Sequence, residues 1–486
     1  MIIYDNIHGY INLDEIASAI VDTPVFQRLR NIHQTGIMYL VFPTANHSRF
    51  EHSVGTYHLA TKMISNIAKK QPDLKVTDEI IQLVGIAGLC NDLGHLLFSH
   101  LFDDYFLDKL PNIKELEKKT SNTIHENRSK FLLNYLVDKY SINLNKDQLK
   151  VIGDLINPKE AEYSKWKPKY HVGKWIFQII SNPLNSIDVD KFDYLTRDTQ
   201  AVGLKFGFDY SRLIFDARVI DNKICYSTQC SEDIYHMFFI RYRLYRQIYN
   251  HKAVKAIEIL LVKLLFEIEK EYKISEYILD PEKMIELVDS YIWHFPNSNS
   301  TINQIIQDIN QRKLPKMVYQ SISLQENNFD IDKLNSKFGN DKFQIVKFKV
   351  GYVGGKSTNP LNHITFYNLK TGQIISENKV RSFSLLINQK YQEYFLRVYC
   401  TDLSIITEVK AYIILMNESN KKESNKDNTI SVNDLKLNDV ENIGIQYNDI
   451  IVNDNIIETI VNDDIIETIV NIGIQYSDIQ EVNIDI

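Results

Sequence analysis

The 486 residues are enough for about two or three ordinary domains, and their 44% hydrophobic content can form a packed core. No run of about 18 apolar residues occurs, which excludes a predicted transmembrane helix. The N-terminus also lacks the pattern of a signal peptide. Four cysteines without CxxC spacing indicate reduced core thiols. We therefore expect a soluble intracellular protein, cytoplasmic or nuclear, with no membrane partner.

The net charge of −7 is unevenly distributed. From Leu415 onward the chain carries 15 acidic and four basic residues, so the body before it is mildly basic. A mildly basic body suits a polyanionic ligand such as a triphosphate and is compatible with weak nucleic-acid binding. Ordinary surface variation explains so small an excess equally well.

Hydrophobic periodicity predicts that residues 1–330 are mostly helical. Apolar residues recur at three- and four-residue spacing between Ser53 and Ala68, and Glu79 to Cys90 is strongly apolar. Ile234 to Lys270 gives a long helical pattern that mixes aromatic and basic residues. These segments indicate a helical body.

The pattern changes at about Lys342. Residues 343–353 alternate between apolar and polar, and residues 362–367 and 394–400 are rich in aromatic and β-branched side chains. We therefore predict a small mixed α/β C-terminal lobe over residues 331–415.

Two nonapeptides repeat in the acidic tail. Residues 442–450 return almost unchanged at 471–479, and residues 453–461 are followed at once by a close copy. Two copies of each are too few for a solenoid. Asparagine-rich, acidic, low-complexity sequence is typical of disorder. We predict a disordered tail over residues 416–486 without a catalytic role, and its composition suggests an AT-rich genome, viral or protist.

Histidines and carboxylates gather in four short segments of the body. Metal phosphohydrolases need such side chains from separate helices to converge on one cation. Each motif alone is more often structural, for example as a helix cap, but their joint occurrence favours a metal site. The four segments contain His52 in RFEHS, Asp92, His95 and His100 in NDLGHLLFSH, His125 and Glu126 in HE, and Asp188, Asp190 and Asp193 in DVDKFDY.

The order of these segments resembles that of the HD-domain deoxynucleoside triphosphate (dNTP) triphosphohydrolases. The resemblance runs from Met1 to about Met416. Because it begins at residue 1, we expect the sterile-alpha-motif domain of the vertebrate members to be absent. Its further markers are NIHG at 6–9, DTP at 22–24, FQRLR at 26–30, VFP at 41–43, FDY at 208–210, ARV at 217–219, Tyr249, His251-Lys252 and RVYC at 397–400.

The resemblance implies a mainly α fold, with an HD-domain helical body over residues 1–330, and a metal-dependent reaction. Family members cut dNTPs into deoxynucleoside and inorganic triphosphate by attack at the α-phosphorus, and the cofactor would be a divalent Fe, Mn, Zn or Mg ion. By position, the implied metal ligands are His52, Asn91, Asp92 and Asp190, and the implied catalytic residues are His95, His100, Asp103 and His125. The implied substrate contacts are Gln34, Arg49, Lys191, Tyr194, Asp198, Arg241 and Tyr249.

The chemistry of these side chains agrees with the implied roles. Arg49, Lys191 and Arg241 would neutralise the triphosphate. Tyr249 would close off the sugar 2′ position, so that a ribose hydroxyl clashes.

Two positions depart from the family pattern. The HD dipeptide is Asn91-Asp92 here, and an amide oxygen is a weaker ligand than an imidazole. Thr35 stands where the family has a leucine beside the sugar, which predicts looser sugar selectivity.

The effector sites of the vertebrate type are partly retained. In that type, guanine and deoxynucleoside triphosphates bind between subunits and drive tetramer formation. We therefore expect a homo-oligomer, dimer or tetramer, with GTP and dNTP as candidate effectors. Departures occur at Met1, Tyr4, Ser227 and Gln229. The matching positions are Asp22, Gln27, Arg30, Arg218, Lys252, Arg312 and Lys316.

Two other functions remain open from the sequence. Asn91 motivates a catalytically silenced nucleotide-binding or interaction protein, and the same residue types could serve a metal phosphodiesterase acting on another nucleotide or on nucleic acid. The presence of His95, Asp103, His125 and Asp190 favours a working enzyme, since a silenced site has less chemical reason to keep them.

Overall fold

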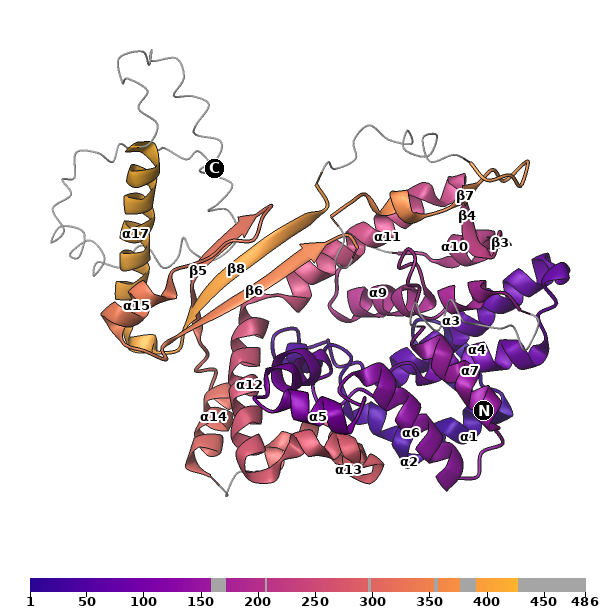
Figure 1. The fold of residues 1–486 in the computed structure, drawn as a ribbon, viewed down its shortest axis with the longest axis horizontal. Coiled ribbons are helices and arrows are strands. Elements are labelled where there is room, and N and C mark those ends of the chain that lie inside the picture. Colours follow the sequence, from indigo (N-terminus) through magenta and orange to yellow (C-terminus); the bar gives the residue numbers. More distant parts are fainter. Residues whose placement is uncertain (159–171, 206–207, 296–298, 354–356, 376–389, 427–486) are drawn as a thin grey trace, which may run out of the picture. The chain divides into compact units, whose positions relative to one another are not determined.

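Helices dominate the computed structural model (Figure 1), which describes residues 1–158, 172–205, 208–295, 299–353, 357–375 and 390–426. The predicted mainly α class is therefore confirmed. Among the described helices, none combines the length and apolar character needed to cross a bilayer. Residues 1–413 form one unit of the structure, and residues 414–486 belong to a second.

Three helices frame the centre of the body. The predicted helices at 53–68 and 79–90 are present as α3 (Arg49–Lys70) and α4 (Asp78–Cys90), and α3 packs against both α4 and α9 (Val189–Ala201). Local sequence sets where they begin, because Ser48 and Glu51 form a capping box on α3 and the Thr77 hydroxyl accepts a hydrogen bond from the first turn of α4.

Shorter elements surround this centre. The chain begins with an antiparallel hairpin of β1 (Ile2–Asp5) and β2 (Gly9–Asn12). The other helices and strands of the body are α1 (Glu15–Val21), α2 (Pro24–Gln27), α5 (Ile113–Lys119), α6 (His125–Lys139), α7 (Lys146–Ile156), α10 (Ser211–Asp216), β3 (Arg218–Ile220), β4 (Lys223–Ser227), α13 (Pro281–Glu286) and α14 (Ser300–Asn310). A π-helical turn, η4, spans Leu101–Phe106.

The predicted helical segment at 234–270 is divided in two. α11 (Ser231–Leu244) runs into a π-helical turn, η8 (Tyr245–Tyr249), and α12 (Lys252–Tyr272) starts afresh. The break falls at Asn250, whose carbonyl oxygen accepts a hydrogen bond from the Arg397 side chain at 2.5 Å. His251 is extended and caps α12. A tertiary contact thus replaces a helical hydrogen bond that periodicity alone would have predicted.

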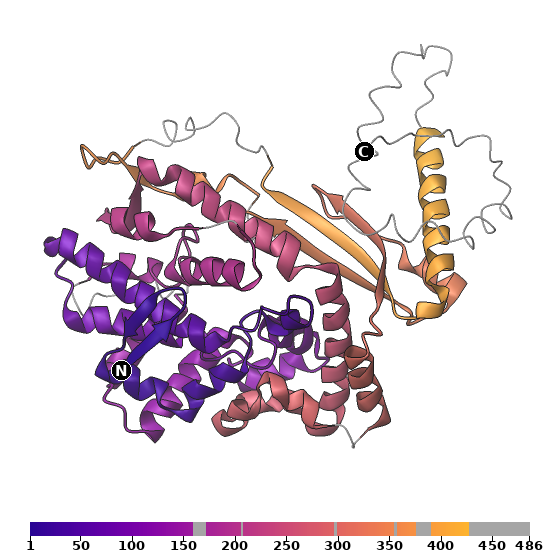
Figure 2. The ribbon, with the colours of Figure 1, turned by 180° about the vertical axis from the view of Figure 1, so that it is seen from behind.

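A three-stranded antiparallel sheet follows the body, in the order β5-β8-β6. The predicted strands at 343–353 and 394–400 appear as β6 (Phe343–Gly351) and β8 (Gln392–Cys400). In Figures 1 and 2 this sheet lies beside α11 and the start of α12. The remaining elements are β5 (Lys316–Ser323), α15 (Ile331–Phe338) and β7 (Phe366–Tyr367), which pairs with β4.

The division at residues 330 and 331 stays a prediction, although β5, which lies before it, pairs with β8 in the same sheet. The segment predicted as a tail begins in a helix, α17 (Ile406–Lys426), which continues past residue 416. The repeated nonapeptides, and with them the predicted disorder, lie outside the described residues.

Candidate active site

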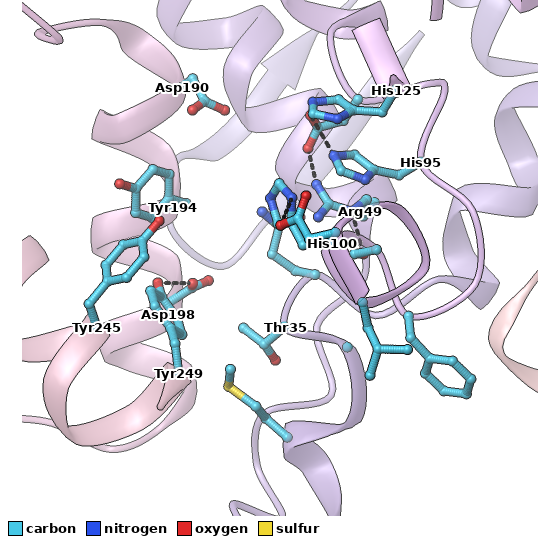
Figure 3. Close-up of a pocket in the computed structure, with 18 of the residues that line it drawn as sticks. Thr35, Arg49, His95, His100, His125, Asp190, Tyr194, Asp198, Tyr245 and Tyr249 are labelled. Carbon is cyan, nitrogen blue, oxygen red and sulfur yellow. Dashed lines mark hydrogen bonds and ion pairs between the residues drawn. The ribbon is translucent and has the colours of Figure 1, made fainter. Parts of the chain in front are cut away.

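Most of the predicted site residues line one cavity of about 500 Å³. Figure 3 shows Tyr194, Tyr245 and Tyr249 facing Arg49 and the histidines across it. His52 and Asp103 are buried just behind its wall. The predicted residues that line it are Gln34, Thr35, Arg49, Asn91, Asp92, His95, His100, His125, Asp190, Lys191, Tyr194, Asp198, Arg241 and Tyr249.

Three of the predicted metal ligands converge. His52 Nε2 lies 3.0 Å from Asp190 Oδ1 and 3.4 Å from Asp92 Oδ2, and all three ligand atoms lie within 4.8 Å of one another. They come from α3, the end of α4 and α9. One imidazole and two carboxylates suit a divalent transition metal or Mn²⁺. Asn91 is the C-cap of α4, directly precedes Asp92 and lines the same cavity.

Opposite charges are concentrated at this cluster. Burial opposes protonation of His52, but hydrogen bonds to Asp190 and Asp193 outweigh it and raise the pKa to about 10. Burial likewise opposes ionisation of Asp92, yet the positive charges of Arg49 and His52 lower its pKa. Arg49 pairs with Asp92 and donates to Ser99 Oγ at 2.8 Å. The cluster therefore holds ionised carboxylates and attracts a cation or proton.

A stacked histidine pair stands beside the metal cluster. The rings of His95 and His125 are 4.0 Å apart between centroids and 19° from parallel, and His100 approaches His95 edge-on at 5.1 Å. Burial, Arg49 and His125 hold the pKa of His95 well below its usual range. Burial also opposes protonation of His125, but its hydrogen bond to Asp103 and the charge of Glu126 raise the pKa. The environments of the two imidazoles thus shift their pKa values in opposite directions, an arrangement that suits acid–base chemistry.

Buried arginines hold the loop that follows α4 and carries Asp92 and His95. Arg28 donates to the carbonyl of His95 at 2.9 Å and also bonds that of Leu93. Arg128, which is fully buried, donates to Gly94 O at 2.8 Å and forms an ion pair with Asp103. Arg28 of the FQRLR segment therefore supports the backbone of this loop.

The opposite wall is built from α9, the end of α11 and η8. Tyr249 donates to Asp198 Oδ2 at 2.5 Å, and His47 Nε2 lies 2.7 Å from the other oxygen of the same carboxylate. Arg241 donates to the carbonyl oxygen of Gly351 at 2.9 Å, which ties this wall to the end of β6. Lys191 Nζ pairs with Asp188, the N-cap of α9, at 3.1 Å.

Three buried polar atoms in the cavity wall have no hydrogen-bond partner among the described residues. They are Gln34 Oε1, Thr35 Oγ1 and His95 Nδ1. An unsatisfied buried polar group costs about 1–3 kcal/mol. Their concentration in one cavity indicates that it accommodates a polar ligand.

Sequence reasoning missed several lining residues. Tyr245 follows Arg241 by four residues and precedes Tyr249 by four, so helical spacing alone could have found it. Lys255 and Glu258 line the cavity from α12 and form an ion pair at 2.7 Å. No local signal marked this pair. Other missed lining residues include Asp104, Tyr105 and Asn250, whereas Glu126 and Asp188, which also line the cavity, belong to the histidine and carboxylate segments named from the sequence.

The predicted effector residues lie outside the cavity. Arg30 is exposed, stacks over Phe50 at 3.5 Å and donates to Gln27 Oε1 at 2.8 Å. Arg312 donates to the Leu40 carbonyl at 2.7 Å. The single chain therefore brings Gln27 and Arg30 together but gives no test of an intersubunit site. The remaining members are Asp22, Arg218, Lys252 and Lys316, of which Asp22, Lys252 and Lys316 are exposed.

The fold and the site together define a helical protein whose cavity combines a histidine–carboxylate cluster that could hold a metal ion with the cationic side chains of Arg49, Lys191 and Arg241. No family model matches the chain. It is 34% identical to the deoxynucleoside triphosphate triphosphohydrolase SAMHD1 homolog of Dictyostelium discoideum, over 82% of this chain and 77% of that protein.

Two further relatives agree. The chain is 35% identical to the HD domain-containing protein L394 of Acanthamoeba polyphaga mimivirus, over 82% of this chain and 92% of that protein. It is 33% identical to the deoxynucleoside triphosphate triphosphohydrolase SAMHD1 of Homo sapiens, over 82% of this chain and 70% of that protein. The chain belongs to the HD-domain dNTP triphosphohydrolase family.

Proposed function

We propose that this protein hydrolyses dNTPs to deoxynucleoside and inorganic triphosphate. The observation that carries the proposal is the single cavity in which the metal cluster, the histidine pair and three cationic side chains meet. The names of the Dictyostelium and human relatives support the same activity. The mimivirus relative is consistent with a viral source, and a viral protein would act inside its host cell.

We propose that a divalent cation, Fe, Mn, Zn or Mg, is held by His52, Asp92 and Asp190, with Asn91 as a weak fourth ligand. Such a cation would polarise a phosphoryl oxygen or activate a water molecule. His125, whose pKa is raised by Asp103 and Glu126, would donate a proton to the leaving 5′-oxygen. His95, whose pKa is lowered, would accept a proton. His100 has a side chain that is 63% exposed, and it would contact the substrate at the cavity mouth.

The remaining side chains would bind and orient the nucleotide. Arg49, Lys191 and Arg241 would neutralise the triphosphate, and their fixed partners reduce the entropy lost on binding. Tyr249, anchored by Asp198, would pack against the sugar, with Tyr194 beside it and Gln34 supplying a polar contact. We also propose that nucleotide effectors bind at the seven predicted effector residues outside the cavity, and that the protein forms a dimer or tetramer.

The test is product identity. The purified full chain is incubated with Mn²⁺ and with each dNTP and NTP separately, and the products are resolved by anion-exchange chromatography. Inorganic triphosphate together with deoxynucleoside supports the proposal. Release of pyrophosphate or orthophosphate, or no turnover of any dNTP, contradicts it. Asp92→Ala is the matched inactive control, because it removes a charged ligand that no neighbour replaces.

A silenced nucleotide-binding protein is the second candidate, motivated by Asn91 alone. It is not favoured, because the other histidines and carboxylates of the site lie close enough to interact as the proposed reaction requires. His125 Nδ1 lies 3.4 Å from Asp103 Oδ2, and His52 Nε2 faces two carboxylates. Binding of dNTP without turnover, in wild type and in Asn91→His alike, would move the conclusion to this candidate.

A further inference from the structure

A buried hydrogen-bond network connects the N-terminal hairpin to the metal cluster. Asp193 is fully buried, and its Oδ2 lies 2.7 Å from Nδ1 of the metal-site residue His52. Its Oδ1 lies 2.6 Å from Nε2 of His8, which is equally buried. His8 comes from the turn between β1 and β2, 185 residues away from Asp193. The first segment of the chain therefore contacts the group that orients a metal ligand.

The hydrogen bonds fit a simple placement of protons. Tyr210 lies 2.8 Å from His8 Nδ1 and can donate its hydroxyl proton there, which leaves His8 Nε2–H to donate to Asp193. Arg197 donates to both oxygens of Asp193 at 2.9 Å. His52 Nδ1–H is the fourth donor. A carboxylate has about four acceptor positions, so Asp193 is saturated, and its bond to Nδ1 leaves His52 Nε2 facing Asp92 and Asp190.

Two features of the surrounding chain support this arrangement. A β-carbon on Gly55 would lie 2.0 Å from Asp193 Oδ1, so the carboxylate occupies space that any other residue would fill. Asp5 fixes the turn that carries His8, because its Oδ1 accepts from the backbone of Ile7 and His8 at 2.9 Å. Its other oxygen accepts from Arg197 at 2.8 Å.

We propose that His8 is a positioning residue of the metal site, which acts through Asp193 to hold the His52 imidazole in the tautomer and orientation that bind a cation. Without His8, Asp193 Oδ1 loses one donor and the carboxylate can rotate away from His52. The proposal rests on the metal site of the proposed function and not on its substrate. Groups that support a metal ligand commonly change metal affinity by about 10–100-fold when they are altered.

The experiment measures Mn²⁺ binding to the metal-free full chain without nucleotide, by the electron paramagnetic resonance signal of free Mn²⁺. His8→Ala is expected to weaken binding about tenfold. His8→Gln retains an N–H donor at the place of Nε2 and is expected to restore most of the affinity. The matched control is His58→Ala. The His58 ring lies 5.3 Å from that of His8, but the hydrogen bonds to Asp193 do not include it.

Folding is followed separately by the thermal midpoint of each metal-free variant. A folded His8→Ala variant with wild-type Mn²⁺ affinity overturns the proposal, as does an equal loss in His58→Ala. If His8→Ala does not fold, the Mn²⁺ affinities of His8→Gln and His8→Leu are compared instead. Only His8→Gln keeps an N–H donor for Asp193, so it alone should retain most of the affinity. Loss of Mn²⁺ affinity in a protein that turns over no dNTP would sustain this inference while refuting the proposed function.

Discussion

A β-carbon on Gly94 would lie 2.1 Å from the carbonyl oxygen of His125. The loop that carries Asp92 and His95 therefore touches the first turn of α6 backbone to backbone, and Gly94 N donates to Ser129 Oγ at 2.8 Å. This close approach is what brings the rings of His95 and His125 into stacking distance. The glycine in the DLGH segment is thus required by the close packing of this loop on α6.

Replacement of Gly94 by alanine is expected to lower both activity and stability. The β-carbon must push α6 away, which separates His95 from His125 and overpacks the core at a cost of about 1–3 kcal/mol. A displacement of about 1 Å at a catalytic group can reduce the rate about 100-fold. The measurements are kcat for dNTP hydrolysis and urea denaturation.

Gly153→Ala is the matched control for that prediction. Gly153 lies within α7, and a β-carbon there would meet only the Lys130 side chain, at 3.5 Å. Alanine is the better helix former by about 1 kcal/mol, so this variant should be as stable as wild type or slightly more stable. A Gly94→Ala variant that behaves like Gly153→Ala would show that α6 and the loop adjust freely.

Sugar discrimination is expected to depend on Thr35. Its hydroxyl is buried in the cavity wall without a described partner, and it stands where the family has leucine. A leucine fills the gap, and a methylene-scale change is worth about 1–3 kcal/mol of selectivity. Thr35→Leu should therefore raise the ratio of kcat/KM for dGTP over GTP. An unchanged ratio would show that Thr35 does not lie beside the sugar.

Sequence periodicity was sufficient for the long elements and insufficient for the contacts between them. α3 and α4 follow directly from apolar spacing and capping residues, because both signals are local. The break at Asn250 depends on Arg397, which lies 147 residues further along the chain. No spacing rule includes such a partner.

The candidate site likewise depends on contacts that local sequence does not reveal. The resemblance to a family identified the residues that line the cavity, whereas periodicity alone left each histidine more easily explained as a structural residue. The contact of His8 with Asp193 escaped both, although NIHG was a marker, because nothing local indicates which buried carboxylate a histidine will meet. The pair of Lys255 and Glu258 belongs to this chain's own cavity and had no motif to mark it.

Arg241 is expected to act mainly in substrate binding. Its guanidinium is fixed by the Gly351 carbonyl and lies 4.3 Å from the centre of the Tyr245 ring, so it is preorganised for an anion. Arg241→Ala should raise KM about tenfold or more, since a charged hydrogen bond is worth about 1.5–3 kcal/mol. Arg246→Ala, on the same helical segment but paired with Glu393 at the surface, should leave KM near wild type. Equal effects of the two variants on KM would contradict a phosphate contact.

Dependence on nucleotide effectors is expected to be weaker than in the vertebrate type. Ser227, where that type has a basic residue, is fully buried and donates to Asp216 at 2.8 Å. It cannot reach an intersubunit phosphate. Gln229 accepts from Arg212 at 3.3 Å and carries no charge. Sedimentation velocity with and without GTP plus dATP, alongside activity assays, measures this, and strict GTP-dependent tetramer formation with activation would refute it.

The last prediction concerns Asn91, which caps α4 beside Asp92 and lines the cavity. Its amide oxygen is a weak ligand for a transition metal, whereas an imidazole is a better σ-donor. Asn91→His is therefore expected to tighten Mn²⁺ or Fe²⁺ binding by about 10–100-fold and to raise the rate at limiting metal. Asp92→Ala should abolish turnover at every metal concentration.

Triphosphate release measured against Mn²⁺, Fe²⁺ and Mg²⁺ concentration separates the possible outcomes. If Asn91 only weakens the site, wild type and Asn91→His differ in metal occupancy alone. Wild type should then approach the rate of Asn91→His only at a high metal concentration. The benefit should be larger for Fe²⁺ and Mn²⁺ than for Mg²⁺, since Mg²⁺ prefers oxygen ligands. A wild type that is fully active at low metal, with Asn91→His no better, would mean that Asn91 coordinates adequately or that another side chain supplies the ligand. His95 and His125 are the first to examine, because their ring nitrogens and an Asp92 carboxylate oxygen lie within 4.8 Å of one another, whereas His47 bonds Asp198 on the opposite wall.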